Sequence, residues 1–228
     1  SYRKVREDLD RGEQFLGFPA PLYGMNITAL RQKVICHLEP VGRAFARAGF
    51  TPNQISLLSL LLGVAAMILF SRRSFPTGSL LLLVSGILDL VDGHVSRIQN
   101  SGSRFGAVFD WIVDKYVDTL ALLGVGLSGI PILSRIADVP PVADPAIVMI
   151  AILGSMMTTF IKPAVYAEAG FADRLHGKIE DPLEGVGFFG RPETLLVLIA
   201  GGCTGLIWAS VIIIAVATNL SPFGRSVY

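Results

Sequence analysis

Four long uncharged apolar segments limit this chain to a narrow set of folds. No charged residue occurs within residues 55–70, 78–88, 146–161 or 195–220. A bilayer core of about 30 Å requires about 20 apolar residues per helix, and these segments have that character. Of the 228 residues, 52% are hydrophobic and 16% are charged, which is less charge than a soluble domain of this size carries. The sequence therefore predicts an integral membrane protein.

We expect an all-α fold with six transmembrane helices, preceded by an interfacial amphipathic helix. Thr51 can cap the first span, and Pro52 suits its first turn. Gly201, Gly202 and Gly205 near the end of the chain indicate either a turn between two helices or a close-packed site within one. The predicted spans are residues 53–70, 78–98, 105–130, 145–168, 191–204 and 206–222.

The segment before the first span has a different pattern. Within residues 27–48, apolar side chains recur at helical spacing, and most cations fall on other faces. This pattern is typical of a helix in the headgroup region, although a soluble helix packed on a partner would show it too. Pro40 is expected to kink or divide this helix. Three segments result: polar and irregular residues 1–25, the interfacial helix 26–50 and the transmembrane domain 51–228.

The distribution of Lys and Arg predicts the orientation in the membrane. Residues 1–50 contain eight of these cations, and further ones lie near residues 97–104 and 174–178. Because cations favour the cytoplasmic side, the N-terminus is expected inside a multi-pass protein of the cell membrane. Arg135 lies in the predicted outer loop, and Arg72 and Arg73 argue against this orientation. The net charge of +1 identifies no partner, and no nucleic-acid partner is expected.

Spans two and three carry carboxylates that apolar helices do not ordinarily contain. An ionised carboxylate at a helix centre costs about 2.5–3.5 kcal/mol by insertion scales, so four would cost roughly 10 kcal/mol. Such a cost needs compensation, and a functional site is the first explanation. The aspartates concerned are Asp89, Asp92, Asp110, Asp114 and Asp118.

The spacing of these aspartates predicts a metal site. Asp89 and Asp92 are three residues apart, and Asp110 and Asp114 are four apart, so each pair shares one helix face. The short connection 99–104 makes the two helices antiparallel neighbours. Oxygen donors without His or Cys suit hard cations such as Mg²⁺, Mn²⁺ or Ca²⁺. His94 points to another face and is not expected to be a ligand.

Small and basic residues beside the aspartates indicate phosphate chemistry. Gly93 and Gly106 leave room for a ligand to approach the two helices. Arg97 lies one turn beyond Gly93 and suits a phosphate oxygen. The alternative is that the helices pack through their small residues, with Arg97 and Lys115 forming salt bridges to the aspartates.

The stretch D-L-V-D-G-H-V-S-R, eight residues, then G-A-V-F-D-W-I-V-D spans residues 89–114. It resembles the signature of the CDP-alcohol phosphotransferase family, D-x2-D-G-x2-A-R-x8-G-x3-D-x3-D, with Ser96 in place of Ala. The segment TPNQISLLSLL is similar to the first span of that family. The resemblance covers residues 27–222. It implies six spans, a homodimer, and a cytoplasm-facing site that holds two divalent ions, Mg²⁺ or Mn²⁺.

The resemblance also implies roles for individual residues. The reaction would move a substituted phosphate group from a CDP-linked lipid, CDP-diacylglycerol or CDP-archaeol, to an alcohol, with release of CMP. Asp114 would be the general base. Asp118 lies outside the signature, and we expect it to be structural or to support the metal ligands from outside the coordination sphere. The implied metal ligands are Asp89, Asp92, Asp110 and Asp114. The implied CDP contacts are Asn53, Asp89, Gly93, Ser96, Arg97 and Gly106.

The acceptor alcohol is less constrained. Arg104, Lys162 and Arg191 offer cations to the same region and suit an acceptor that carries phosphate. The region resembles the phosphatidylinositol-phosphate and archaetidylinositol-phosphate synthase branch, which implies inositol phosphate. Thr194 and Pro163 depart from the cations expected there. Glycerol 3-phosphate is the alternative acceptor, and Lys162 and Arg191 could instead anchor lipid headgroups.

Two other functions remain open at this point. Buried carboxylates also mark membrane transporters, but the internal repeats and mid-membrane helix breaks of many transporters are not visible here. A non-catalytic scaffold could retain the site as a relic. It would then keep the desolvation cost of four aspartates with no metal or substrate to offset it.

Overall fold

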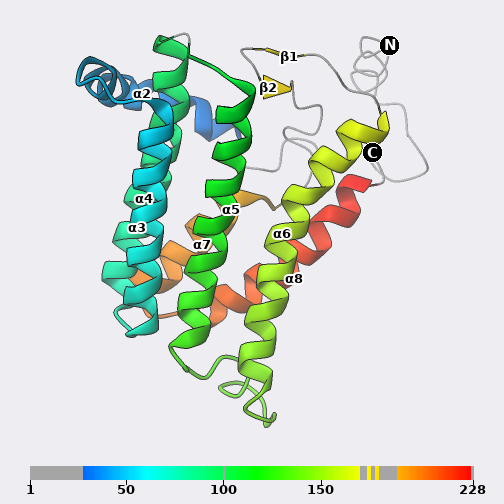
Figure 1. The fold of residues 1–228 in the computed structure, drawn as a ribbon. Helices are drawn as coiled ribbons and strands as arrows, with labels where there is room; N and C mark the ends of the chain where they lie inside the picture. Colours follow the sequence, from blue (N-terminus) through cyan, green and yellow to red (C-terminus); the bar gives the residue numbers. More distant parts are fainter. Residues whose placement is uncertain (1–27, 100, 170–173, 176–177, 180–188, 227–228) are drawn as a thin grey trace.

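The computed structural model describes residues 28–99, 101–169, 174–175, 178–179 and 189–226. The predicted N-terminal segment 1–25 lies outside these residues. Within them the chain is almost entirely helical (Figure 1). The elements are α2 (Thr28–Arg47), α3 (Pro52–Ser71), α4 (Phe75–Ile98), α5 (Arg104–Leu127), α6 (Ala143–Ala169), β1 (Arg174–Leu175), β2 (Lys178–Ile179), α7 (Arg191–Thr204) and α8 (Ile207–Ser226).

The helices predicted from the apolar segments are confirmed as helices. Thr51 caps α3 as predicted: its hydroxyl accepts from the Gln54 amide, and the Gln54 side chain accepts from the Thr51 amide. α5 ends at Leu127, three residues earlier than predicted. α2 continues through Pro40, so this proline does not divide the helix, and the alternative of a kink stays a prediction. The short antiparallel pair β1–β2 was not predicted from the sequence.

The three glycines at the end of α7 provide both a turn between two helices and a close-packed site within one helix. Gly205 adopts a left-handed conformation with φ of 76° and ends α7. Gly201 and Gly202 lie inside α7 in close contact with other helices. A Cβ at Gly201 would lie 1.9 Å from the Ser210 hydroxyl of α8, and one at Gly202 would lie 1.9 Å from the Ser79 hydroxyl of α4. The turn thus depends on one glycine, and helix packing depends on the other two.

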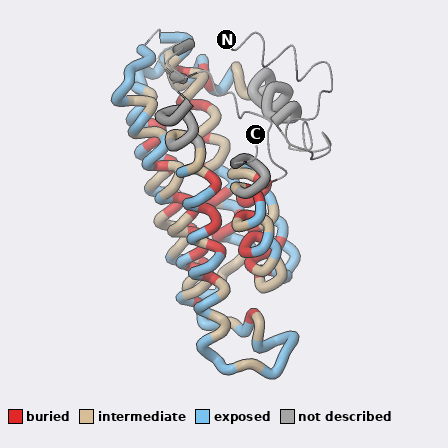
Figure 2. Tube along the Cα trace, turned by 90° about the vertical axis from the view of Figure 1, so that its right-hand side faces the viewer, coloured by how far each residue is buried: buried red, intermediate tan, exposed pale blue. Residues whose placement is uncertain are grey.

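The helices form two adjoining groups, which are joined by α7 and by the packing of α5 against α6. α3 packs along α4 and α5, while α6 packs along α8 (Figure 1). α7 contacts both α4 and α8, and α2 crosses the end of α4. Buried positions follow the inward faces of the long helices, and the loop between α5 and α6 is mainly exposed (Figure 2). The main core includes Phe70, Leu82, Leu122, Leu198 and Ile214.

Small and hydroxyl residues let α3 approach its neighbours closely. Ser59 and Ser85 exchange hydrogen bonds between α3 and α4, with their hydroxyl oxygens 2.9 Å apart. A Cβ at Gly124 of α5 would lie 2.5 Å from the Met67 carbonyl oxygen of α3. Such small-residue contacts are the usual means by which helices pack in lipid, where apolar burial provides little drive for association.

The apolar surfaces of the helices agree with a membrane protein. Among the described residues, α3, α4 and residues Ala143–Ile161 of α6 are long and apolar enough to cross a bilayer. α5 has 24 residues but includes three aspartates and one lysine within its apolar length. α7 has 14 residues, which extend about 21 Å, less than the bilayer core. The six-span arrangement and the interfacial place of α2 stay predictions.

Candidate metal and phosphate site

The site lies where α4 ends and α5 begins, on the side of the bundle that α2 crosses (Figure 1). Ser103 caps α5, and its hydroxyl accepts a hydrogen bond of 2.9 Å from the Gly106 amide. This cap fixes the start of α5 after the short connection from α4. The two antiparallel helices then place Asp110 opposite the last turns of α4.

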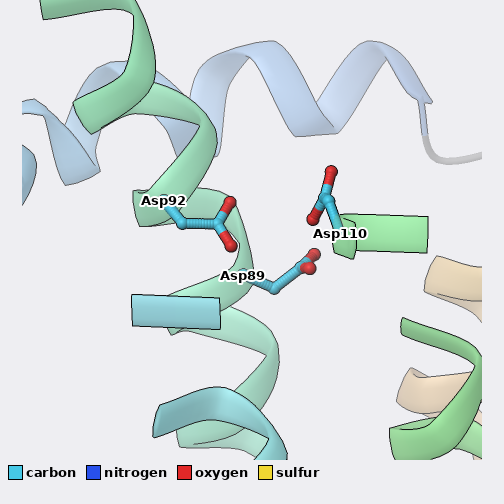
Figure 3. Close-up of side chains that lie close together, drawn as sticks. All are labelled: Asp89, Asp92 and Asp110. Atoms are coloured by element: carbon cyan, nitrogen blue, oxygen red, sulfur yellow. The ribbon is translucent and has the colours of Figure 1, made fainter. Parts of the chain in front are cut away.

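Three of the predicted metal ligands are brought together. Asp89 and Asp92 extend from α4 toward Asp110 of α5 (Figure 3). One carboxylate oxygen of each residue lies within 4.8 Å of those of the other two. The Ser56 hydroxyl of α3 donates to Asp92 Oδ2 at 2.5 Å, and the Asp92 side chain is buried. Three helices therefore determine the position of this cluster.

Asp114, the predicted base, faces Arg191 at the start of α7. Arg191 Nη2 lies 3.0 Å from Asp114 Oδ1 as an ion pair, although the angle does not suit a hydrogen bond. Arg191 Nη1 donates to Asp89 Oδ2 at 2.6 Å. The guanidinium thus links the predicted base to the metal cluster, and all three side chains are mostly buried.

Asp118 extends the same line of charges one turn deeper. Its side chain is fully buried, and Oδ1 accepts from Arg191 Nε at 3.4 Å. Oδ2 accepts from Lys115 Nζ at 2.9 Å, and Lys115 also donates to the Ser155 carbonyl of α6 at 3.2 Å. Buried carboxylates are tolerated when cations and hydrogen bonds satisfy them, and this residue meets that condition.

The other predicted CDP contacts lie at the start of α3, in the last turns of α4 and in the first turn of α5. A Cβ at Gly93 would meet no atom of the described residues within 4 Å, so the helix surface is open there. A Cβ at Gly106 would lie 3.4 Å from Asn53 Oδ1, which places Asn53 of α3 beside the start of α5. Ser96 is half-buried on α4, and Arg97 is exposed one residue further.

The predicted acceptor contacts are placed differently from one another. Arg104 is exposed at the first residue of α5. Arg191 lies among the aspartates, as described above. Lys162 belongs to α6, but its side chain lies outside the part of the chain that the structure describes. His94 is absent from the described metal cluster: its ring packs against α2, where a Cβ at Gly42 would lie 2.5 Å from it.

Ser56 and Lys115 contribute to the site in ways that the sequence did not indicate. Ser56 was not singled out, although Asn53 lies one turn before it on the same helix face. Lys115 was considered only as a salt-bridge partner in the packing alternative, and it reaches Asp118 and α6. Spacing on α3 could have indicated Ser56. The contact of Lys115 with α6 has no local signal, since it depends on how α5 and α6 cross.

Comparison with known proteins decides the family. The model of the CDP-alcohol phosphatidyltransferase family matches residues 50–221. The chain belongs to this family. The CDP-alcohol phosphatidyltransferase match includes every aspartate of the site, Asn53 and Arg191, and it confirms the resemblance inferred from the signature.

Curated relatives match part or most of the chain. The chain is 31% identical over 104 residues to an archaetidylinositol phosphate synthase of Pyrococcus horikoshii, which covers 46% of this chain and 55% of that protein. It is 31% identical over 177 residues to a phosphatidylinositol phosphate synthase of Corynebacterium glutamicum, covering 74% of this chain and 70% of the relative. The chain thus spans only about half the length of the archaeal relative that it matches.

A solved CDP-alcohol phosphatidyltransferase has the same fold. The phosphatidylinositol phosphate synthase of Mycobacterium tuberculosis, crystallised with CDP-DAG bound, superposes with a TM-score of 0.65 at 23% identity. The superposition covers 82% of this chain and 90% of that one. A further crystal structure of that synthase is a complex with manganese and citrate, also with a TM-score of 0.65. At this identity the likeness concerns the fold.

Proposed function

We propose that the protein transfers a substituted phosphate group from a CDP-linked lipid to an inositol phosphate and releases CMP. The observation that carries this proposal is the convergence of Asp89, Asp92 and Asp110 within 4.8 Å, inside a chain of the CDP-alcohol phosphatidyltransferase family. Relatives from an archaeon and a bacterium are named as inositol-phosphate lipid synthases, which favours this acceptor over glycerol 3-phosphate.

The residues of the cluster fit a divalent cation. Oxygen ligands around Mg²⁺ at 2.0–2.1 Å lie about 3–4 Å apart, and one oxygen of each of the three carboxylates lies within 4.8 Å of the other two. The donor set contains only oxygen, which suits Mg²⁺ or Mn²⁺. A manganese complex of the Mycobacterium tuberculosis relative supports the same class of ion. We propose that the site binds two ions, which are held by Asp89, Asp92, Asp110 and Asp114.

Different residues of the chain would carry out different parts of the reaction. The bound cations would neutralise the pyrophosphate of the donor and stabilise CMP as the leaving group. Asp114 accepts the proton of the acceptor hydroxyl while the oxygen of that hydroxyl attacks the lipid-side phosphorus. The new bond joins that oxygen to phosphorus, and the bond from phosphorus to the CMP oxygen breaks. Asn53, Gly93, Ser96, Arg97 and Gly106 hold the CDP portion near the aspartates.

The phosphate group of the acceptor would bind to the basic side chains beside Asp114. Arg191 lies 3.0 Å from the proposed base, so a phosphate held by its guanidinium would lie next to that carboxylate. Arg104 and Lys162 complete the proposed acceptor site. A guanidinium suits phosphate oxygens because its donors form a planar fork.

The membrane arrangement follows from the same proposal. Helices α3 to α8 would provide six crossings, with α7 assisted by tilt or local thinning of the bilayer. The aspartate cluster would face the cytoplasm, where water-soluble acceptors are present, and the lipid chains of the donor would stay in the bilayer. α2 would lie along the cytoplasmic interface, and the enzyme would act as a homodimer.

The test is CMP release by the purified full chain in nanodiscs. CDP-diacylglycerol and CDP-archaeol are supplied with Mg²⁺ and, separately, with inositol phosphate, glycerol 3-phosphate or serine. We expect CMP only with inositol phosphate, and loss of the product with EDTA or in Asp114→Asn. CMP release with glycerol 3-phosphate alone would replace the acceptor. Folded, metal-loaded protein that neither releases CMP nor binds CDP would refute the transferase proposal.

A further inference from the structure

One guanidinium group contacts three carboxylates, of which one is fully buried and two are mostly buried, and this arrangement has a consequence for metal binding. Arg191 Nη1 lies 2.6 Å from Asp89, Nη2 lies 3.0 Å from Asp114, and Nε lies 3.4 Å from Asp118. The Arg191 side chain is 19% exposed. It begins α7, so its backbone is fixed by that helix while its side chain crosses to α4 and α5.

The three contacts belong to two different kinds of residue. Asp89 and Asp114 occupy proposed metal-ligand positions in the signature. Asp118 lies one turn beyond the signature, is fully buried and is also held by Lys115 at 2.9 Å. Two of the guanidinium contacts are therefore on groups that the metal needs, and the third is on a group that the metal does not use.

We infer that Arg191 competes with divalent cations for the carboxylates of Asp89 and Asp114, and that cation binding displaces its guanidinium. Cation binding to Asp89 and Asp114 removes the partners of both Nη groups and repels the guanidinium. Asp118 keeps its contact with Nε, so the side chain pivots on Asp118 and presents its Nη groups to the acceptor phosphate. This inference rests on the proposed function, because it assigns the order in which metal and acceptor engage the same residues.

The exchange explains why Asp118 and Lys115 lie so deep in the bundle. Without Asp118, an Arg191 side chain displaced from Asp89 would have no fixed partner, and its guanidinium would no longer be oriented toward the acceptor phosphate. Lys115 links Asp118 to the Ser155 carbonyl of α6, and this linkage fixes the pivot relative to three helices. Asp118 is thus a positioning residue for Arg191. Because coupling is reciprocal, metal also raises the affinity for the phosphate that Arg191 binds.

The direct test measures metal affinity in the absence of any CDP-lipid. Mn²⁺ binding to the full chain in detergent is followed by calorimetry and by the electron paramagnetic resonance of free Mn²⁺ at pH 8. Arg191→Gln removes the competing charge, and we expect its Mn²⁺ affinity to be at least about 10-fold tighter than that of the unmodified protein. Arg191→Lys keeps the charge without the fork and should fall between them.

Arg97→Gln is the matched control. Like Arg191→Gln, it removes one guanidinium charge, but from an exposed position in the last turn of α4. Its effect on Mn²⁺ affinity should stay within about threefold, as expected for a screened charge. Equal or weaker Mn²⁺ binding in Arg191→Gln would overturn the exchange and leave the transferase proposal intact. Absence of Mn²⁺ binding in both proteins would overturn the exchange together with the proposed metal site.

Asp118 is tested by separating acceptor binding from turnover. In Asp118→Asn the pivot is weakened, so the KM for inositol phosphate should rise about 10-fold or more while kcat at saturating acceptor changes less than threefold. Asp118→Glu keeps the charge and should recover most of the affinity. A loss of kcat with unchanged KM in both variants would show that Asp118 does not position Arg191. Mn²⁺ affinity, measured on the same samples, checks that the metal cluster persists.

Discussion

The two ends of the helix bundle use aspartate in different ways. One end of the bundle, the loop end, contains the α5–α6 connection of residues 128–142. There a single residue in the first turn of α6, Asp144, accepts four hydrogen bonds. Its Oδ1 accepts from three successive amides, those of Ile132, Leu133 and Ser134, at 2.7–3.0 Å, and its Oδ2 accepts from the Ser134 hydroxyl at 2.5 Å. Neutral donors of one short segment surround this carboxylate.

At the carboxylate end, which is the site of Asp89, Asp92, Asp110 and Asp114, the aspartates are grouped. Their described partners come from other helices: Ser56 of α3 and Arg191 of α7. A carboxylate satisfied by local dipoles fixes a loop and needs nothing more. Carboxylates grouped at the meeting of four helices repel one another, and bound cations relieve that repulsion. The difference distinguishes a structural aspartate from the cluster that we propose to be catalytic.

The largest expected effect comes from Asp110→Asn at the carboxylate end. The substitution removes a proposed charged metal ligand, and we expect CMP release to fall at least about 10³-fold, which corresponds to about 4 kcal/mol of transition-state stabilisation. The thermal midpoint in detergent should stay the same or rise, because the repulsion among carboxylates declines. Activity within tenfold of the unmodified enzyme, in protein that still binds Mn²⁺, would exclude Asp110 as a ligand.

The second prediction compares one substitution at two glycines. Gly124→Ala places a Cβ 2.5 Å from the Met67 carbonyl oxygen and 2.8 Å from its Cα, so α3 and α5 must separate at a cost of about 1–3 kcal/mol. Gly93→Ala meets open space and should leave the thermal midpoint unchanged or slightly raised. It should instead raise the KM for the CDP-lipid. Equal destabilisation by both substitutions would show that the surface at Gly93 is not open in solution.

Much of this fold was predictable because its signals are local. The apolar segments end at charged or capping residues, so the bounds of α3, α4 and α6 followed within a few residues. The grouping of Asp89, Asp92 and Asp110 followed from helical spacing and a short connection between the two helices. Neither inference required knowledge of how distant helices pack.

The position of Arg191 could not be predicted in the same way. It contacts Asp89 across 102 positions of sequence, and that contact depends on how α7 lies against α4 and α5. The sequence indicated Arg191 as a cation near the site that suits an acceptor phosphate, but it did not indicate the contacts of Arg191 with the aspartates. Asp118 lies outside the signature and was interpreted as structural or as a support for the metal ligands, and its link to Arg191 depends on the position of α7. Long-range pairing between helices leaves no periodic signal in the chain.

The third prediction tests the loop end. Asp144→Ala removes the acceptor of three amides and one hydroxyl, and we expect a loss of about 1–3 kcal/mol in stability because two of those amides are partly buried. The kcat for CMP release, measured below the lowered midpoint, should change less than twofold. Ser134→Ala loses one of the four hydrogen bonds and should be milder. A large fall in kcat for Asp144→Ala would show that the two ends are coupled.

The smallest expected effect concerns the hydroxyl behind the metal cluster. Ser56 donates to Asp92 at 2.5 Å, and a partner of this kind orients a metal ligand from outside the coordination sphere. Ser56→Ala should weaken Mn²⁺ binding about 5- to 10-fold, equivalent to about 1 kcal/mol, the usual contribution of one hydrogen bond. Ser59→Ala, three residues further along α3, removes hydrogen bonds to Ser85 instead. It should lower the thermal midpoint without changing Mn²⁺ affinity. If the two serines gave the same pattern, the orientation of Asp92 would depend on the general packing of α3 against α4, and Ser56 would have no specific part in it.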